Sequence, residues 1–134
     1  MAHPNPFVFV YGSLRRGGAK HVLLLQAGGR PIADGTIAGR LFDLGRYPAA
    51  VKATDRKSRI RGEVYVLPDS TAGLAKLDRV EGYDHARVSK SLFARRVVTV
   101  TLDGGKTLDA WAYFYNKPVK QARELAGGEW RARV

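Results

Sequence analysis

Continuous and alternating runs of apolar residues predict that most of this chain is β-strand. The first run covers residues 7–10 and is rich in Val and Phe, a composition typical of a buried strand. Further strands are predicted by apolar runs, or by apolar residues alternating with polar ones, at positions 31–44, 60–67, 92–102 and 107–115. Asp103-Gly104-Gly105 separates the last two, so we expect them to pair as a β-hairpin.

Two segments have apolar residues at helical spacing instead. Residues 19–26 are predicted to form a short helix that ends at Gly28-Gly29. Residues 70–80 are predicted to form a second, amphipathic helix, with Asp69 available to cap its start and Gly82 well placed to end it. The strands are mostly joined as hairpins and do not alternate regularly with helices, so the predicted fold class is α+β.

Interior glycines shape the expected sheet. Gly35 and Gly39 lie within the long strand 31–44, where they permit bends or bulges that curl a sheet. We therefore expect a small bent mixed β-barrel of five to seven strands, with two short helices against its outside or across one end. Residues 62–67 echo residues 39–44, which we interpret as two neighbouring strands of one sheet.

The composition limits the chemistry that the protein can use. The chain has 134 residues, enough to bury a core as a single domain over residues 1–134, and it contains no cysteine. Disulfide frameworks, cysteine-ligated zinc and thiol nucleophiles are therefore excluded. Because no apolar stretch is long enough to span a bilayer and the first residues do not have the pattern of a secretion signal, we expect a soluble cytoplasmic protein.

The formal net charge of +11 at pH 7 suggests attraction to nucleic acid, anionic surfaces or acidic small molecules. The densest basic run contains Lys52, Arg56, Lys57, Arg59 and Arg61. No aromatic side chains are interleaved with this run for stacking on bases. We therefore interpret it as a solvated loop and do not expect nucleic acid to be the partner.

The turn after the first strand is the first candidate for binding chemistry. Tyr11-Gly12-Ser13-Leu14 follows an apolar run directly, and a turn of small residues can expose consecutive backbone N–H groups. Such a group of donors binds anions or the oxyanion of a reaction intermediate. The alternative is an ordinary strand that ends in a Gly-Ser turn.

Glu81 is the candidate for proton transfer. It follows the predicted second helix directly, beside Leu77, Val80 and Tyr83, and the carbonyl end of a helix carries partial negative charge. Both that charge and burial near apolar groups raise the pKa of a carboxyl group, which suits proton transfer near neutral pH. The alternative is an exposed glutamate before a glycine that ends the helix.

Other residue types do not suggest a metal site or a nucleophile. His3, His21 and His85 lie far apart in the sequence without the spacing of paired metal ligands, so we expect no metal. Ser13 lacks the Gly-x-Ser-x-Gly setting of a nucleophilic serine, and we interpret it as a turn residue.

Five motifs follow one another along nearly the whole chain: Tyr11-Gly12-Ser13-Leu14-Arg15, Gly39-Arg40-Leu41, Tyr47-Pro48, Gly62-Glu63-Val64-Tyr65 and Leu77-Asp78-Arg79-Val80-Glu81-Gly82-Tyr83. In this order they resemble the motifs of the γ-glutamylcyclotransferase-like family. Each motif is weak alone, but their shared order makes the resemblance specific. It implies a small bent β-barrel with peripheral helices, in agreement with the reading of the strand pattern.

The resemblance also implies a reaction. In this family the α-amine of a γ-glutamyl group attacks its own γ-carbonyl, which yields 5-oxoproline and releases an amino acid or an amine, without a metal or a cofactor. The family's acid/base glutamate matches Glu81. The backbone amides of its Tyr-Gly-Ser-Leu turn hold substrate oxygens, a role that falls here to Tyr11, Gly12, Ser13 and Leu14. The implied partner is thus a small γ-glutamyl compound.

Further residues are candidates for the walls of the pocket. Tyr47, Tyr83 and Tyr115 are expected either to line it or to lie in the core with the hydroxyl at the surface. Arg15 and Arg16 are more typical of surface or structural positions than of a carboxylate site.

Two other positions bear on the resemblance. The family's Tyr-x-Arg signature is replaced here by Phe93-Ala94-Arg95, which removes a phenolic hydroxyl. Trp130 either packs near the pocket or is an ordinary anchor.

These observations favour a γ-glutamyl cyclotransferase with Glu81 as general acid/base. The alternative is a non-catalytic member of the fold that binds an acidic ligand or nucleic acid, as the positive charge suggests. A γ-glutamyl hydrolase is a third hypothesis, which would release free glutamate.

Overall fold

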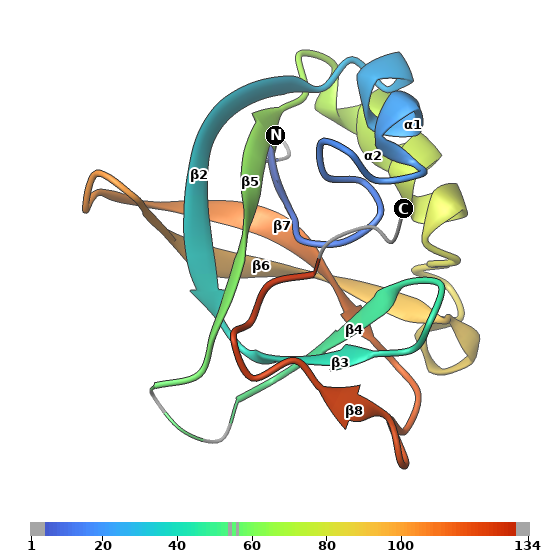
Figure 1. Ribbon diagram of the computed structural model, residues 1–134. Coiled ribbons are helices and arrows are strands. Elements are labelled where there is room, and N and C mark those ends of the chain that lie inside the picture. Colours follow the sequence, from blue (N-terminus) through green and yellow to red (C-terminus); the bar gives the residue numbers. More distant parts are fainter. Residues whose placement is uncertain (1–4, 54, 56, 131–134) are drawn as a thin grey trace.

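The computed structural model describes residues 5–53, 55 and 57–130, and its central feature is a closed β-barrel (Figure 1). In the described residues the barrel has the strand order β1-β5-β2-β6-β7. These strands are β1 (Phe7–Val10), β2 (Arg30–Ala38), β5 (Arg59–Val66), β6 (Phe93–Leu102) and β7 (Thr107–Tyr115). The pairs are antiparallel except β1 with β7, where a parallel contact between Val8 and Trp111 closes the barrel. The predicted α+β fold with a small mixed barrel is confirmed, as is the hairpin of β6 and β7.

The predicted strand 31–44 is wrong as a single element, because the chain breaks at Gly39. A Cβ atom at Gly39 would lie 2.6 Å from Ile60 Cδ1 and 3.1 Å from the Val51 carbonyl oxygen, so only glycine fits this close approach. β2 ends before it in the barrel, and β3 (Arg40–Asp43) continues after it in a second sheet.

The second sheet packs below the barrel in Figure 1 and has the order β4-β3-β8. Its other strands are β4 (Pro48–Val51) and β8 (Arg123–Glu124), neither of which was predicted. The expectation that residues 39–44 and 62–67 are neighbouring strands of one sheet is wrong, because β3 belongs to this sheet and β5 to the barrel. The neighbours of β5 are β1 on one side and β2 on the other, and β2 pairs with it along its whole length.

Both predicted helices are present, α1 (His21–Gln26) and α2 (Ser70–Val80), and they lie together across one side of the barrel (Figure 1). A short 3₁₀ helix, η1 (Val88–Lys90), follows α2. The Asp69 side chain accepts a hydrogen bond of 3.1 Å from the Ala72 N–H, as expected of a helix cap. Gly82, with φ of 65°, ends α2 where the sequence predicted. No helix in the described part of the chain is long and apolar enough to cross a membrane.

Two groups of buried side chains form the core. One fills the barrel interior and includes Phe9, Ile37, Ile60, Val64 and Val100. The other joins the helices to the outside of the barrel, and its members include Leu24, Leu74, Leu77, Tyr65, Phe93 and Tyr113. Full burial of one such leucine stabilises the fold by about 1.5–3 kcal/mol. The second group therefore fixes the end of α2, and with it Glu81, against the barrel.

The basic run divides between a loop and a strand. Lys52 and Lys57 are exposed on the loop before β5, as predicted. Arg59 and Arg61 instead lie on β5, where Arg59 donates to the Thr36 carbonyl oxygen at 3.0 Å and Arg61 pairs with Asp103 at 3.1 Å. Arg56, like His3, lies outside the described residues.

Candidate active site

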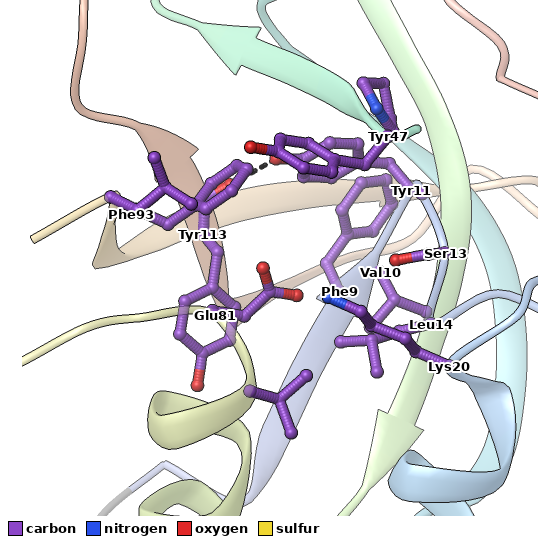
Figure 2. A pocket seen from close by; sticks show the side chains of 14 residues that line it. Phe9, Val10, Tyr11, Ser13, Leu14, Lys20, Tyr47, Glu81, Phe93 and Tyr113 are labelled. Carbon is purple, nitrogen blue, oxygen red and sulfur yellow. Dashed lines mark hydrogen bonds between the residues drawn. The ribbon is translucent and has the colours of Figure 1, made fainter. Parts of the chain in front are cut away.

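A cavity, partly open to solvent, lies where the end of β1 meets the end of α2 (Figure 2). Its walls come from the end of β1 and the turn after it, the residue before α1, the start of β4, the end of α2, the start of β6 and the second half of β7. The lining residues are Phe9, Val10, Tyr11, Gly12, Ser13, Leu14, Lys20, Tyr47, Pro48, Val80, Glu81, Leu92, Phe93 and Tyr113.

The turn of Tyr11 to Leu14 forms one wall and leaves its donors free. No hydrogen bond joins the backbone N–H groups of Gly12, Ser13 and Leu14 to an acceptor in the described residues. Gly12 packs against the ring of Pro48, and a Cβ atom there would lie 2.9 Å from two ring carbons. The turn thus has the unpaired donors that the sequence suggested, beside a cavity that a substrate can enter.

Tyr11 anchors the turn. Its side chain is buried, and its hydroxyl donates a 2.5 Å hydrogen bond to the backbone carbonyl oxygen of Tyr113 on β7 (Figure 2). Burial, and then the nearby carboxyl of Glu81, raise the pKa of Tyr11. The hydroxyl therefore remains protonated and is occupied in tying β1 to β7.

Glu63 holds the far side of the turn, and sequence reasoning did not single it out. Its buried carboxylate accepts hydrogen bonds from the Arg16 N–H at 3.1 Å, the Tyr65 hydroxyl at 3.0 Å and Arg15 Nε at 3.3 Å. Burial alone would raise the pKa of Glu63, but these donors outweigh it and lower that pKa. The sequence did contain a sign of the contact between Glu63 and Tyr65. The two residues are two positions apart in a strand, so their side chains lie on one face of β5.

Glu81 forms the wall opposite the turn. It is the residue that ends α2, and its own N–H donates to the Leu77 carbonyl oxygen at 2.9 Å. Its carboxyl points into the cavity (Figure 2) and has no hydrogen bond or ion pair with another described residue. Burial raises the pKa of Glu81 to about 7, and the positive charge of Lys20 acts in the opposite direction. The carboxyl is therefore able both to give and to take a proton near neutral pH.

An ion pair one turn before Glu81 connects α2 to the barrel. Asp78 pairs with Arg95 of β6, with 2.9 Å between Asp78 Oδ1 and Arg95 Nε, and accepts a 2.7 Å hydrogen bond from the Tyr113 hydroxyl of β7. The Arg95 guanidinium in turn stacks over Trp111, 4.3 Å from the ring centre. These contacts hold the last turn of α2 in place, and so position Glu81.

The structure brings together six of the eight predicted site residues: Tyr11, Gly12, Ser13, Leu14, Tyr47 and Glu81. Tyr83 does not line the cavity, because Gly82 turns the chain away and directs this tyrosine to an outer groove beside Arg95. Tyr115 does not line it either, since Phe93 stands in front of it with 5.5 Å between the two ring centres.

The structure also shows the positions of three residues whose roles the sequence left open. Arg15 pairs with Glu63 and Glu129 at 3.3 Å each, so it has the structural role that its residue type suggested. Arg16 is more exposed and pairs with Asp34 and Glu63. Trp130 packs beside the barrel core and lines a separate depression with both arginines.

Several lining residues were not predicted, among them Lys20, Phe93 and Tyr113. Lys20 directly precedes α1, and only the fold of the 11–20 segment directs it back to the cavity. Among the described residues, no cluster of three or more His, Asp or Glu side chains is arranged to hold a metal ion.

Comparison with known proteins agrees with this geometry. Residues 8–132 match the family model described as "Gamma-glutamyl cyclotransferase, AIG2-like". The chain is 30% identical over 124 residues to the gamma-glutamylcyclotransferase family protein YtfP of Escherichia coli, covering 92% of this chain and 94% of that protein. It is 33% identical over 113 residues to the gamma-L-glutamyl-butirosin B gamma-glutamyl cyclotransferase of Niallia circulans, covering 84% and 68%.

The fold is also found among solved structures. The crystal structure of an AIG2-like protein from Mus musculus superposes with a TM-score of 0.69 at 20% identity, covering 87% of this chain and 81% of that one. The family model spans nearly the whole sequence, and two curated relatives reach 30% identity or more over most of it. The chain therefore belongs to the gamma-glutamyl cyclotransferase, AIG2-like family.

Proposed function

We propose that this protein is a γ-glutamyl cyclotransferase that converts a small γ-glutamyl amide into 5-oxoproline and a free amino acid or amine. One observation carries the proposal: the Glu81 carboxyl, with its pKa raised to about 7, faces a wall with three backbone N–H groups, and neither it nor they have a hydrogen-bond partner in the described part of the chain. A proton carrier and an oxyanion site are the two elements that this reaction needs.

The chemistry requires no nucleophile from the protein. The α-amine of the substrate attacks the γ-carbonyl carbon, a C–N bond forms, and the carbonyl oxygen becomes an oxyanion. When the oxyanion collapses, the bond to the leaving nitrogen breaks, and that nitrogen takes a proton. Atoms balance without water, so the enzyme has only to fold the substrate back on itself and to move protons.

Glu81 is proposed to move those protons. In its ionised form it takes a proton from the α-ammonium group, which makes the amine nucleophilic, and it then donates this proton to the leaving nitrogen. The new ring nitrogen loses a second proton to the ionised carboxylate, which passes it to the released amine, so that the amine leaves as an ammonium and Glu81 is ionised again. A pKa of about 7 lies between that of an ordinary glutamate and that of an amine, so both transfers are feasible at neutral pH.

The turn is proposed to bind the oxygens of the substrate. Donors from Gly12, Ser13 and Leu14 face no competing acceptor among the described residues, and removal of one such donor typically costs about 3–4 kcal/mol of barrier. The rings of Tyr47 and Phe93, 5.7 Å apart between centres, supply a rigid wall against which the substrate folds.

The relatives support the same reaction class. The curated relative from Niallia circulans is named a γ-glutamyl cyclotransferase of γ-L-glutamyl-butirosin B. That name supports an amide of γ-glutamate as the substrate of this chain, and it does not identify the leaving group.

The test is direct detection of 5-oxoproline. Purified protein is incubated with a panel of γ-glutamyl amino acids and γ-glutamylamines, and 5-oxoproline and free glutamate are both quantified. We expect 5-oxoproline from at least one substrate, and its loss in Glu81→Gln. Glu124→Gln is the matched control, because Glu124 is an exposed glutamate that pairs with Arg40 away from the cavity.

Three results would contradict the proposal. No product from any substrate rejects the activity. Free glutamate in place of 5-oxoproline identifies a hydrolase. Full activity in Glu81→Gln rejects the role of that carboxyl.

A further inference from the structure

We infer that Lys20 binds the α-carboxylate of the γ-glutamyl group and so makes a free α-carboxylate a requirement for the substrate. The inference rests on the proposed function, in which the α-ammonium group of the substrate lies at Glu81. It adds a specificity-determining residue to the site, from a part of the chain that none of the sequence motifs includes.

The backbone fixes Lys20 beside the turn. Its N–H donates a 2.9 Å hydrogen bond to the Ser13 carbonyl oxygen, and the next residue, His21, makes a 2.9 Å contact between Nδ1 and the Leu14 carbonyl oxygen. The His21 ring also packs edge-on against Tyr65, 5.9 Å between centres. The start of α1 is thus attached to the wall that supplies the free N–H groups.

Charge makes Lys20 distinctive. It and Glu81 are the two charged residues among the lining side chains, and Lys20 is half-buried without an ion pair to another described residue. Figure 2 shows its side chain extending into the cavity toward Glu81, and its charge acts on the Glu81 carboxyl. A half-buried ammonium group that has no fixed partner is available to a ligand anion.

The geometry of the substrate supplies that anion. In a γ-glutamyl group the α-ammonium and the α-carboxylate are attached to one carbon, so a substrate that places the ammonium at Glu81 has its carboxylate close by. A cation next to Glu81 matches this pair of opposite charges. Desolvation of the carboxylate without a counter-charge would be costly, and Lys20 supplies that charge. If Lys20 binds the carboxylate, the N–H groups of the turn are free to bind the γ-oxygen.

The experiment compares two substrates in three variants. The substrates are the best γ-glutamyl compound of the panel and its α-carboxamide, which has the same leaving group but no negative charge. The variants are Lys20→Gln, Lys20→Arg as the conservative change, and Lys76→Gln. Lys76 is an exposed lysine on α2 outside the cavity, and its substitution removes the same charge without touching the site.

We expect Lys20→Gln to lower kcat/KM for the carboxylate substrate by roughly 10- to 100-fold, mainly through KM, the value of a lost hydrogen bond to a charged group. The loss on the α-carboxamide is expected to be at least about fivefold smaller, because that substrate has no carboxylate for Lys20 to bind and is affected only through the influence of the Lys20 charge on Glu81. Lys20→Arg should recover part of the loss, and Lys76→Gln should match the wild type. Because amidation changes the basicity of the amine for every variant alike, variants are compared on one substrate at a time.

Equal losses on both substrates would overturn the inference, since Lys20 would then act only through Glu81. A wild type that uses both substrates equally well would overturn it too.

A binding measurement keeps this inference separate from the proposed function. 5-Oxoproline and its carboxamide are titrated at pH 6 into the wild type and Lys20→Gln, and followed by NMR. If the wild type forms no 5-oxoproline from any substrate but binds 5-oxoproline through Lys20, the proposed function fails and the carboxylate site stands. If the wild type is active but Lys20→Gln binds 5-oxoproline as tightly, the carboxylate site fails alone. If 5-oxoproline is neither formed nor bound, both fail.

Discussion

Two glutamates lie next to the 11–18 segment, and they have opposite environments. Glu63 has almost no exposed surface and accepts hydrogen bonds from Arg15, Arg16 and Tyr65. The Glu81 carboxyl lies in the cavity and has no hydrogen bond to another described residue. The same side chain therefore has a lowered pKa in one region and a raised pKa in the other.

Hydrogen-bond donors, and not burial, decide the role of each carboxylate in this protein. Burial is the largest single influence on both groups, and it raises the pKa in each case. At Glu63 the donors of the chain outweigh it and hold the ionised form as a structural anchor. At Glu81 no group among the described residues fully offsets the effect of burial on the pKa, so the carboxyl exchanges its proton near pH 7. We expect this contrast to separate activity from stability.

The largest effect is expected from removing the exchangeable proton. Glu81→Gln keeps the shape of the side chain but can neither take nor give a proton. We expect kcat/KM for 5-oxoproline formation to fall by about 10³-fold, within the usual range for loss of a general acid/base. Steady-state kinetics measure it, and activity within tenfold of the wild type would remove Glu81 from the mechanism.

The next effect is on stability. Glu63→Ala leaves Arg15, the Arg16 N–H and the Tyr65 hydroxyl without their acceptor, so we expect the free energy of unfolding at pH 7 to fall by about 3 kcal/mol. Urea unfolding followed by circular dichroism checks this. The loss should shrink as the pH drops below 4.5, because the contribution of a carboxylate with a lowered pKa disappears as it is protonated. A loss that does not depend on pH would contradict the electrostatic origin.

Glu81 should show the opposite pH dependence. Below pH 4.5, the ordinary pKa of glutamate, the carboxyl is protonated in both the folded and the unfolded chain and costs no stability. As the pH rises from there through about 7, the folded chain loses stability, because the unfolded chain ionises the carboxyl more readily. With a discount for the water that reaches this half-buried residue, the cost is about 2 kcal/mol. Glu81→Gln should therefore be about 2 kcal/mol more stable than the wild type at pH 8 and equal to it at pH 4. An inactive variant that is also less stable at pH 8 would argue that Glu81 is paired in solution.

A smaller effect is expected from the ion pair that positions Glu81. Asp78→Asn removes the charge that faces Arg95 but keeps a group able to bond the Tyr113 hydroxyl. We expect kcat to fall about tenfold because the end of α2 becomes less precisely placed, with the pH midpoint of activity changed as well. Arg79→Gln, on the exposed side of the same turn, is the control. An unchanged kcat in a folded Asp78→Asn variant would show that Glu81 is positioned by packing alone.

The smallest effect concerns the family tyrosine that this chain lacks. Phe93→Tyr adds a hydroxyl to a ring that is 5% exposed and packed between Tyr47 and Tyr115. We expect a loss of about 1 kcal/mol in the free energy of unfolding, because the hydroxyl enters an apolar wall, and a change in kcat/KM below about threefold. A gain in activity of tenfold or more would mean that the hydroxyl binds the substrate.

Much of the fold and part of the site followed from the sequence, because both depend on local order. The hydrophobic pattern predicted the barrel strands and both helices, and Gly82 marked the end of α2. The position of Glu81 directly after α2, beside Leu77 and Val80, made it the candidate for proton transfer, with an exposed glutamate as the alternative. These features are set by neighbours along the chain, whose identities the sequence states directly.

The remaining features depend on contacts between distant segments. Only packing against Ile60 shows that Gly39 breaks the strand and sends β3 to a second sheet. The second sheet also needs β8, two residues whose pattern has no strand signal. The direction of a side chain is equally a matter of the tertiary structure: Tyr83 turns outward, Phe93 screens Tyr115, and Lys20 enters the cavity.

The contrast between the two glutamates has the same origin. Along the sequence both glutamates stand beside apolar residues, Val64 at Glu63 and Val80 at Glu81, and this likeness does not distinguish their environments. The tertiary structure decided that Arg15, Arg16 and Tyr65 converge on Glu63 while only the charge of Lys20 acts on Glu81. Hydrogen bonds act over about 3 Å, so which donors a carboxylate meets is known only when the chain has folded.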